Sequence, residues 1–136
     1  MLKNKQGAGF VIFNKSSPEQ MLALIREDGL FDIPKGRRDD NESDLEAARR
    51  ECFEECSIMI EENEMLPIHP YHDGVLTVFG AETDKIPVIT PNIHSGILEH
   101  TGYKWLNKKD FCSACLPYLK SPVIHFYATR DKTQNS

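Results

Sequence analysis

Three glutamates, Glu51, Glu54 and Glu55, are the residues whose type and spacing most clearly indicate chemistry. They fall in a stretch without Gly or Pro, and on a helix such neighbours share one face because each turn holds about 3.6 residues. Carboxylates so close together repel and raise one another's pKa. A divalent cation, which prefers oxygen ligands, would remove that repulsion. The spacing therefore predicts a metal site.

The same acids also fit an ordinary exposed helix face. Glu is common on solvated helix surfaces, and Arg50 could serve as a charge partner. Leu45, Ala48 and Cys52 form an apolar stripe beside the acids, which predicts that the acid face lies at the margin of the buried surface. Taken alone, the three acids leave both interpretations open.

Four cysteines, Cys52, Cys56, Cys112 and Cys115, form one pair four residues apart and one pair three apart. This spacing raises the alternative of a structural zinc site in a protein without hydrolase activity. Both pairs fall in helix-like segments, where Cys is a common small buried residue. We therefore predict four reduced thiols with packing roles.

Hydrophobic patterning predicts the elements that position the acids. Ser43 followed by Glu46 matches a capping box and predicts a helix from Ser43 to Cys56. Asn14–Pro18 supplies turn chemistry between two apolar runs, which indicates a hairpin. The strands predicted in this half are Gly7–Phe13, Met21–Ile25 and Leu30–Ile33, with a polar loop over Lys35–Ser43.

The second half of the chain mixes shorter strands with helical segments. We predict an exposed loop over Asp84–Gly96, because it contains two prolines. A helix is predicted from about Lys108 to Leu119, with the segment after Pro122 extending it or adding a turn. The predicted strands are Ile58–Ile60, Gly74–Phe79 and Tyr103–Leu106, and residues 129–136 are expected to fray. This order indicates a mixed α/β domain.

Composition limits the class of protein. The 136 residues suit one domain, 1–136. Sixteen Lys plus Arg against 21 Asp plus Glu leave a net charge of -5, so a polyanion would have to be bound locally by a few basic residues or a cation. No apolar run approaches the roughly 18 residues of a membrane span, and no hydrophobic signal core follows the first residues. We therefore expect a cytoplasmic protein without membrane partners.

From Gly36 to Ile58 the sequence resembles the Nudix box, G-x5-E-x7-R-E-U-x-E-E-x-G-U, in which U is apolar. The matching positions are Gly36, Glu42, Arg50, Glu51, Cys52, Glu54, Glu55 and Ile58. Ser57 departs from the pattern, which has Gly there. That Gly is expected to take the left-handed turn that closes the helix, so Ser57 should cost about 1 kcal/mol of stability without removing a ligand.

The resemblance implies the Nudix fold, an α/β architecture with a mixed β-sheet sandwiched between α-helices. It also implies a pyrophosphohydrolase that cleaves a nucleoside diphosphate linked to another group. The residues implied to hold Mg²⁺ or Mn²⁺ are Glu51, Glu54, Glu55 and, through its carbonyl, Gly36. Glu42 is implied to complete the outer metal shell or to fix the loop.

Basic residues around the box are the candidates for binding phosphate. Lys35, Arg37 and Arg38 lie in the predicted loop before the helix, where cations could meet phosphate oxygens. Ordinary loop charge explains each of them equally well. By resemblance, Arg50 orients the carboxylates and does not touch substrate.

A second resemblance concerns the general base. The segment from Glu99 to Trp105 resembles the E-H-x-x-Y-x-W segment of asymmetrically cleaving diadenosine tetraphosphate hydrolases, as does the Pro34-Lys35-Gly36 entry to the box. Glu99 is therefore a candidate base, and Glu51 is the alternative within the box. Tyr103 and Trp105 fit equally well as core residues on one strand face. The predicted catalytic residues are Arg50, Glu51, Glu54 and Glu99.

These resemblances predict a dinucleoside polyphosphate, such as diadenosine tetraphosphate, as the substrate. Such a substrate needs an aromatic surface for a base, offered by Tyr103 or Phe31, and cations along its phosphate chain, among them Lys104. The alternatives are ADP-ribose or a nucleotide sugar, an RNA 5′ end as the one nucleic-acid ligand, and a non-catalytic Nudix-fold binding module. The sequence predicts no oligomeric state.

Overall fold

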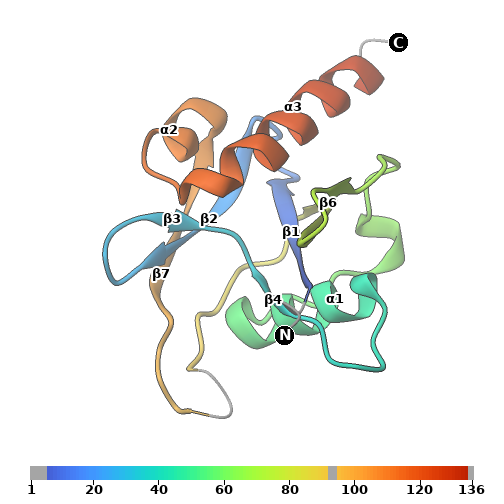
Figure 1. Cartoon of the computed structure of the whole chain (residues 1–136). Helices are drawn as coiled ribbons and strands as arrows, with labels where there is room; N and C mark the ends of the chain where they lie inside the picture. Colours follow the sequence, from blue (N-terminus) through green and yellow to red (C-terminus); the bar gives the residue numbers. More distant parts are fainter. Residues whose placement is uncertain (1–5, 92–94, 135–136) are drawn as a thin grey trace.

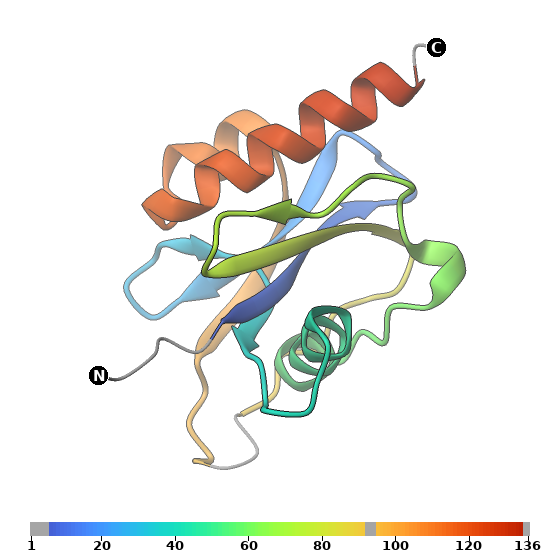
Figure 2. The same ribbon diagram turned by 45° about the vertical axis from the view of Figure 1, so that its right-hand side comes forward.

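The computed structural model describes residues 6–91 and 95–134, and within these ranges seven strands form one mixed sheet. The strands are β1 (Gly7–Asn14), β2 (Gln20–Arg26), β3 (Phe31–Asp32), β4 (Lys35–Arg37), β5 (Tyr71–His72), β6 (Leu76–Thr83) and β7 (His100–Asn107). The helices are α1 (Asp44–Cys56), α2 (Lys108–Ser113) and α3 (Lys120–Gln134), and 3₁₀ turns span Glu62–Glu64 and Pro117–Leu119. Helix α1 covers one face of the sheet, and α2 and α3 cover the other (Figures 1 and 2). The predicted mixed sheet between helices is confirmed.

Alternation along the central strand divides the core into two layers. In β1, Phe10 and Ile12 belong to the α1-side core, whereas Val11 and Phe13 belong to the α3-side core. Successive side chains of a strand point to opposite faces, so a strand covered on both faces is apolar throughout. This continuous run explains why β1 could be predicted from the sequence.

Strands β1 and β2 separate, and the gap between them holds residues of the candidate site. Along one edge β1 pairs with β6, and along the other it pairs with β2, where Phe13 lies opposite Met21, and then with β4. Strand β2 pairs with β7 along one edge and, beyond Met21, with β3 along the other. The segment that contains β3 and β4 therefore crosses from β2 to β1 and fills the gap.

Two predictions before residue 61 are wrong. Lys35–Arg37, predicted as part of a loop, forms β4 because its backbone pairs with the start of β1. Ile58–Ile60, predicted as a strand, is irregular chain. Its two isoleucines are fully buried in the α1-side core. The apolar pattern correctly predicts that this segment is buried, but it cannot show whether a neighbouring strand is available to pair with it.

The C-terminal helical region also differs from its prediction. The helix expected to reach Leu119 ends at Ser113, ahead of Pro117. Residues 129–134, expected to fray, continue α3, and the Arg130 guanidinium lies 3.8 Å from the centroid of the Phe13 ring. Residues 135–136 of the predicted tail lie outside the described ranges, as do 92–94 of the predicted loop. None of the described helices is long and apolar enough to span a membrane.

Candidate active site

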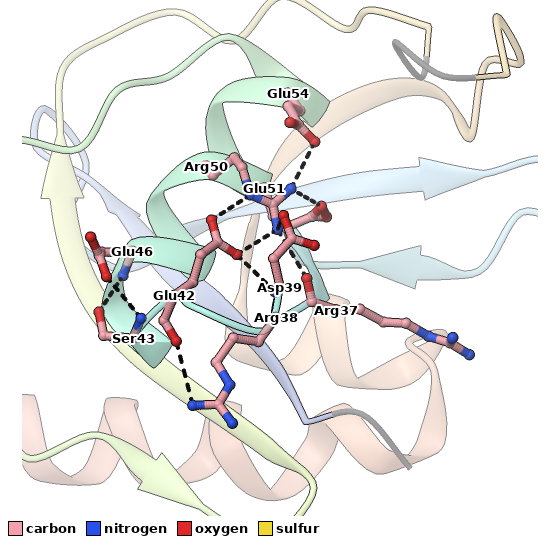
Figure 3. A network of polar contacts seen from close by, with 9 residues as sticks. All are labelled: Arg37, Arg38, Asp39, Glu42, Ser43, Glu46, Arg50, Glu51 and Glu54. Atoms are coloured by element: carbon pink, nitrogen blue, oxygen red, sulfur yellow. Dashed lines mark hydrogen bonds and ion pairs between the residues drawn. The ribbon is translucent and has the colours of Figure 1, made fainter. Parts of the chain in front are cut away.

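Helix α1 has sequence signals at both ends. The Ser43 hydroxyl accepts a hydrogen bond from the Glu46 N–H at 3.1 Å, and the Ser43 N–H donates to the Glu46 carboxylate at 2.8 Å (Figure 3). At the other end Ser57 has a φ of 62°, the one positive φ among the described non-glycine residues. The predicted helix, its capping box and the left-handed turn at Ser57 are confirmed.

The acids of α1 lie at the margin between core and solvent, as predicted. Cys52 is fully buried, whereas the side chains of Glu51 and Glu54 are 16% and 20% exposed. Glu55 is half-buried, and its Oε1 accepts a hydrogen bond from the Lys35 N–H of β4 at 3.3 Å. The acid face of the helix therefore meets the segment that fills the β1–β2 gap.

Arg50 connects these acids to the loop before the helix (Figure 3). Its Nη1 donates to Glu51 Oε1 at 3.0 Å and to Glu54 Oε1 at 3.2 Å. Its Nε and Nη2 donate to the Glu42 carboxylate at 2.7 and 2.9 Å, and Nη2 also donates to the Arg37 carbonyl at 3.0 Å. These hydrogen bonds lower the pKa of Glu42 to about 2. The guanidinium is directed at protein groups through all three nitrogens, which is the geometry of a residue that orients carboxylates.

Gly36 allows the Glu51 side chain of α1 to approach β4 closely. It lies opposite Ala8 in the sheet, and a Cβ added to it would overlap the Glu51 carboxyl group. A residue without a side chain lets the strand backbone and this carboxylate touch. Gly36 of β4 and Glu51 of α1, which are two separate positions of the Nudix box, are thus in direct contact.

The carboxylates of α1 have raised pKa values. Burial, followed by the charges of Glu51 and Asp32, raises the pKa of Glu55 to about 10. Burial, together with the charges of Glu54 and Glu99, raises the pKa of Glu51 to about 7 despite the neighbouring guanidinium. These acids repel one another in the ionised form, so a cation among them would lower both pKa values.

The chemistry of this donor set fits a hard divalent cation. Three carboxylates and the Gly36 carbonyl offer oxygen atoms alone, which Mg²⁺ and Mn²⁺ prefer. Within residues 6–91 and 95–134, no three acidic, His or Cys side chains are already arranged as metal ligands. Glu51 and Glu54 turn toward Arg50 instead, so they would have to turn from the guanidinium to ligate a cation.

An open cleft beside Gly36 contains two of the predicted phosphate-binding cations. Lys35 and Arg37 line it with Tyr118, and the Lys35 ammonium lies 5.7 Å from the centroid of the Tyr118 ring. We call it the Tyr118 cleft. Its wall consists of Gly7, Lys35, Gly36, Arg37, Asp73, Val75, Leu76 and Tyr118. Sequence reasoning missed Tyr118, because no local pattern distinguishes it from another surface aromatic.

A second open cleft also includes Lys35, and we call it the Glu99 cleft. Its wall consists of Arg26, Glu27, Asp28, Asp32, Lys35, Glu99 and His100. The charge of Glu99 contributes to the raised pKa of Glu51, so the predicted base lies within electrostatic range of the box. Sequence reasoning also missed Asp32, although an acid inside the apolar run Leu30–Ile33 was an available signal.

Two other predicted cations are not brought to the clefts. Arg38 lies at the start of α1, where its Nε is 3.7 Å from Asp44 Oδ1 and its Nη1 donates to the Glu42 carbonyl at 3.4 Å. Lys104 lies opposite Ala23, a residue of the α3-side core. Facing residues of paired strands point to the same side, so Lys104 points away from the face that carries α1.

The predicted stacking residues lie outside both clefts. Tyr103 and Trp105 are half-buried against the α1-side core, as expected for alternate residues on one strand face. Phe31 packs on Phe111 with ring centroids 6.1 Å apart, on the α3 side. Tertiary packing therefore uses these rings as core.

The four cysteines, all within the described ranges, are free thiols in two separate cores. Cys52 and Cys56 belong to the α1-side core, with their sulfur atoms 3.8 Å apart. Cys115 belongs to the α3-side core, and Cys112 packs against it. The sheet lies between the two pairs, so the four-cysteine zinc alternative is wrong.

The sequence matches the family model of the NUDIX domain over residues 3–121. The chain therefore belongs to the Nudix family, and its predicted class, hydrolases that act on phosphoric anhydride bonds, is confirmed. No curated protein matches the sequence.

Solved structures share this fold at low sequence identity. An Ap4A hydrolase from C. elegans, solved as a binary complex, is 21% identical with a TM-score of 0.68 over 94% of this chain and 98% of that chain. MutT protein from Methanosarcina mazei Go1 is 18% identical with a TM-score of 0.70 over 96% and 99%. The E. coli dihydroneopterin triphosphate pyrophosphohydrolase is 20% identical with a TM-score of 0.63 over 90% and 95%. At these identities the likeness concerns the fold.

Proposed function

We propose that this Nudix hydrolase is a metal-dependent pyrophosphohydrolase whose preferred substrate is a dinucleoside polyphosphate, such as diadenosine tetraphosphate, cleaved to unequal nucleotides. The observation that carries the proposal is that two open clefts share Lys35, next to Gly36 and the acids of α1. A pyrophosphate bound at this point would have a cleft on each side for the groups that it joins. This arrangement supports the substrate class together with the resemblance of Glu99–Trp105 and Pro34-Lys35-Gly36 to diadenosine tetraphosphate hydrolases.

The acids of the box would hold the metal. In this proposal Glu51, Glu54, Glu55 and the Gly36 carbonyl bind Mg²⁺ or Mn²⁺. When bound, such a cation neutralises charge on the pyrophosphate and makes a water molecule more acidic. Glu42 engages Arg50 through both of its oxygens, so it is assigned to holding this guanidinium and, with it, the loop.

The remaining charged groups would act directly on the reactants. Glu99, exposed in the Glu99 cleft, would accept the proton of the attacking water. Glu51 is the alternative base within the box. Lys35 and Arg37 would pair with phosphate oxygens at the Tyr118 cleft.

One base of the substrate would stack on Tyr118. This ring is 51% exposed, and the neighbouring Val75 adds apolar surface that is 54% exposed. A nucleobase offers a flat face for such stacking, worth about 1–3 kcal/mol per base. The C. elegans Ap4A hydrolase among the similar structures supports the same substrate class.

A substrate panel tests the proposal. We expect diadenosine tetraphosphate to have the highest kcat/KM with Mg²⁺ when compared with ADP-ribose, a nucleotide sugar, a diphosphoinositol phosphate and 5′-triphosphorylated RNA. A preference of more than tenfold for ADP-ribose would overturn the substrate and leave the family unchanged. Tyr118→Ala should raise KM about tenfold, whereas the matched control Tyr118→Phe, which keeps the ring, should stay near the wild-type value.

The proposal also includes a cytoplasmic location and a single Nudix domain over 1–136. Four free thiols, with two sulfur atoms 3.8 Å apart, are typical of proteins kept in a reducing compartment. Cell fractionation would test the location, and limited proteolysis would test the single domain.

A further inference from the structure

Asp32 of β3 is a buried carboxylate to which the proposed chemistry gives no role. It is 5% exposed, and its Oδ1 accepts a hydrogen bond from the Ile33 N–H at 2.8 Å. Its Oδ2 lies 3.0 Å from His100 Nε2, and the Lys35 ammonium lies 3.3 Å from Oδ1 and 3.5 Å from Oδ2. Burial acts to raise the pKa of Asp32, but His100 and Lys35 hold this pKa below its usual value. An ionised carboxylate only accepts hydrogen bonds, so His100 donates through Nε2.

A β-bulge brings His100 to this carboxylate. Asp32 lies opposite Leu24, a residue of the α1-side core, and two residues further along β2, Arg26 lies opposite His100. Facing residues and residues two apart on a strand share a face, so Asp32 and His100 point to the same side. Thr101 is the extra residue of β7 at the register shift. Regular alternation from the rest of β7 would have turned His100 to the other face.

The Asp32–His100 pair connects two groups that the proposed function places on the reactants. Lys35 contacts Asp32 and lines both clefts. Glu99 precedes His100 in the chain and lines the Glu99 cleft. Strand β7 begins at His100, and Glu99 is the residue directly before it. The position of His100 therefore determines the position of the Glu99 backbone.

We propose that the His100–Asp32 hydrogen bond is a positioning clamp that fixes Glu99, at the head of β7, relative to Lys35 on β4. This inference rests on the proposed function, in which Glu99 is the base and Lys35 binds phosphate. His100 is 4% exposed and Asp32 is 5% exposed, so both are positioning residues that act through these neighbours.

Substitution of His100 tests the clamp. His100→Leu removes the donor and should lower kcat about tenfold or more, because Glu99 would no longer be held in place. Mg²⁺ half-saturation should stay within about twofold, because the box is untouched. His100→Gln keeps an N–H donor near the Nε2 position and should retain kcat within about threefold. Ile33→Val, a fully buried neighbour of Asp32, is the control that lowers stability without lowering kcat.

A double-mutant cycle separates positioning from general destabilisation. If His100 acts through Glu99, His100→Leu should lower kcat by less than about twofold in a Glu99→Gln background. Multiplication of the two losses would overturn the clamp while leaving the hydrolase proposal standing. Equal loss in His100→Leu and His100→Gln would also overturn it, because the donor would then be irrelevant.

A spectroscopic readout of the wild-type protein does not depend on turnover. In the wild-type protein, ¹⁵N NMR of the histidine side chains should show a proton on His100 Nε2 that is protected from solvent exchange. Asp32→Asn should shift this resonance and shorten its exchange time. An unprotonated Nε2 would overturn the clamp. If no nucleotide of the panel were hydrolysed, the proposed function would be wrong. The NMR spectrum of His100 does not depend on that result, so the two failures can be told apart.

Discussion

The acids of α1 and the Lys35–Asp32–His100 group are adjacent, yet they are assembled over different ranges of sequence. The first group comes from one stretch, Gly36 to Glu55, and Arg50 holds it together through contacts to the same stretch. The second group combines β3, β4 and the start of β7, and its central contact joins Asp32 to a residue 68 positions away.

The different sequence ranges of the two groups indicate which part of the site depends on the sheet. The α1 acids need a helix and the short strand β4 that passes close to it, and local capping provides the helix. The second group needs the β1–β2 gap and the bulge at Thr101. Damage to the start of β7 should therefore disturb Glu99 before it disturbs the acids of α1.

The largest expected effect is a loss of turnover when a metal ligand loses its charge. Glu54→Gln and Glu55→Gln should each lower kcat by about a hundredfold or more and leave folding nearly intact, because each removes one carboxylate from the cation. Kinetics at saturating Mg²⁺ with circular dichroism would measure this. The matched control is Glu62→Gln, an equal charge loss at an exposed site outside the box. Wild-type turnover in either variant would make the metal assignment wrong.

Gly36→Ala tests whether strand and helix must touch. The added Cβ would overlap the Glu51 carboxyl group, so we expect a loss of about 1–3 kcal/mol of stability together with weaker Mg²⁺ binding. Denaturant unfolding and Mg²⁺ titration measure the two effects. Gly102→Ala is the control, because a Cβ there meets nothing within 4 Å. Equal behaviour of the two variants would contradict the contact.

The pH dependence of stability without metal should show the crowding of the α1 acids. Glu55 keeps its proton up to a pKa of about 10 when folded, against an ordinary value of 4.5. At pH values between these two pKa values, the unfolded chain therefore binds fewer protons than the folded protein. The free energy of unfolding should fall as the pH rises, by at most about 1.4 kcal/mol per pH unit for one proton. Mg²⁺ should reverse this fall, because it favours the ionised carboxylates. Thermal melts from pH 6 to 9 in EDTA and in Mg²⁺ would check this, and a fall that Mg²⁺ leaves unchanged would contradict it.

The smallest expected effect concerns the end of α1. Ser57→Gly should raise stability by up to about 1 kcal/mol, because glycine adopts a φ of 62° without strain. The Ser57 hydroxyl donates to the Val88 carbonyl at 3.0 Å, and its loss offsets part of the gain. Chemical denaturation measures the change, and kcat should not move. A destabilised variant would show that this hydrogen bond outweighs the strain.

Several features of this protein were available in the sequence because their causes are local. The capping box places the start of α1, the spacing of Glu51, Glu54 and Glu55 places them on one face, and the pattern of the box indicates a left-handed residue at Ser57. Each depends on hydrogen bonds or periodicity within a few residues. The acid face and its position at the core margin were therefore predicted correctly.

Pairing partners decided what the sequence left open. Lys35–Arg37 has a polar composition typical of a loop, yet it is a strand because β1 offers it a free edge. Tyr103 has the residue type for stacking on a base, yet packing against the α1 side covers it and leaves Tyr118 at a cleft. The bulge at Thr101 turns His100 to the face of Asp32 against the period-two rule. Local pattern fixes which face of an element is apolar, but strand edges and register shifts are settled between distant segments, so only the tertiary structure could bring Lys35, Asp32 and His100 together.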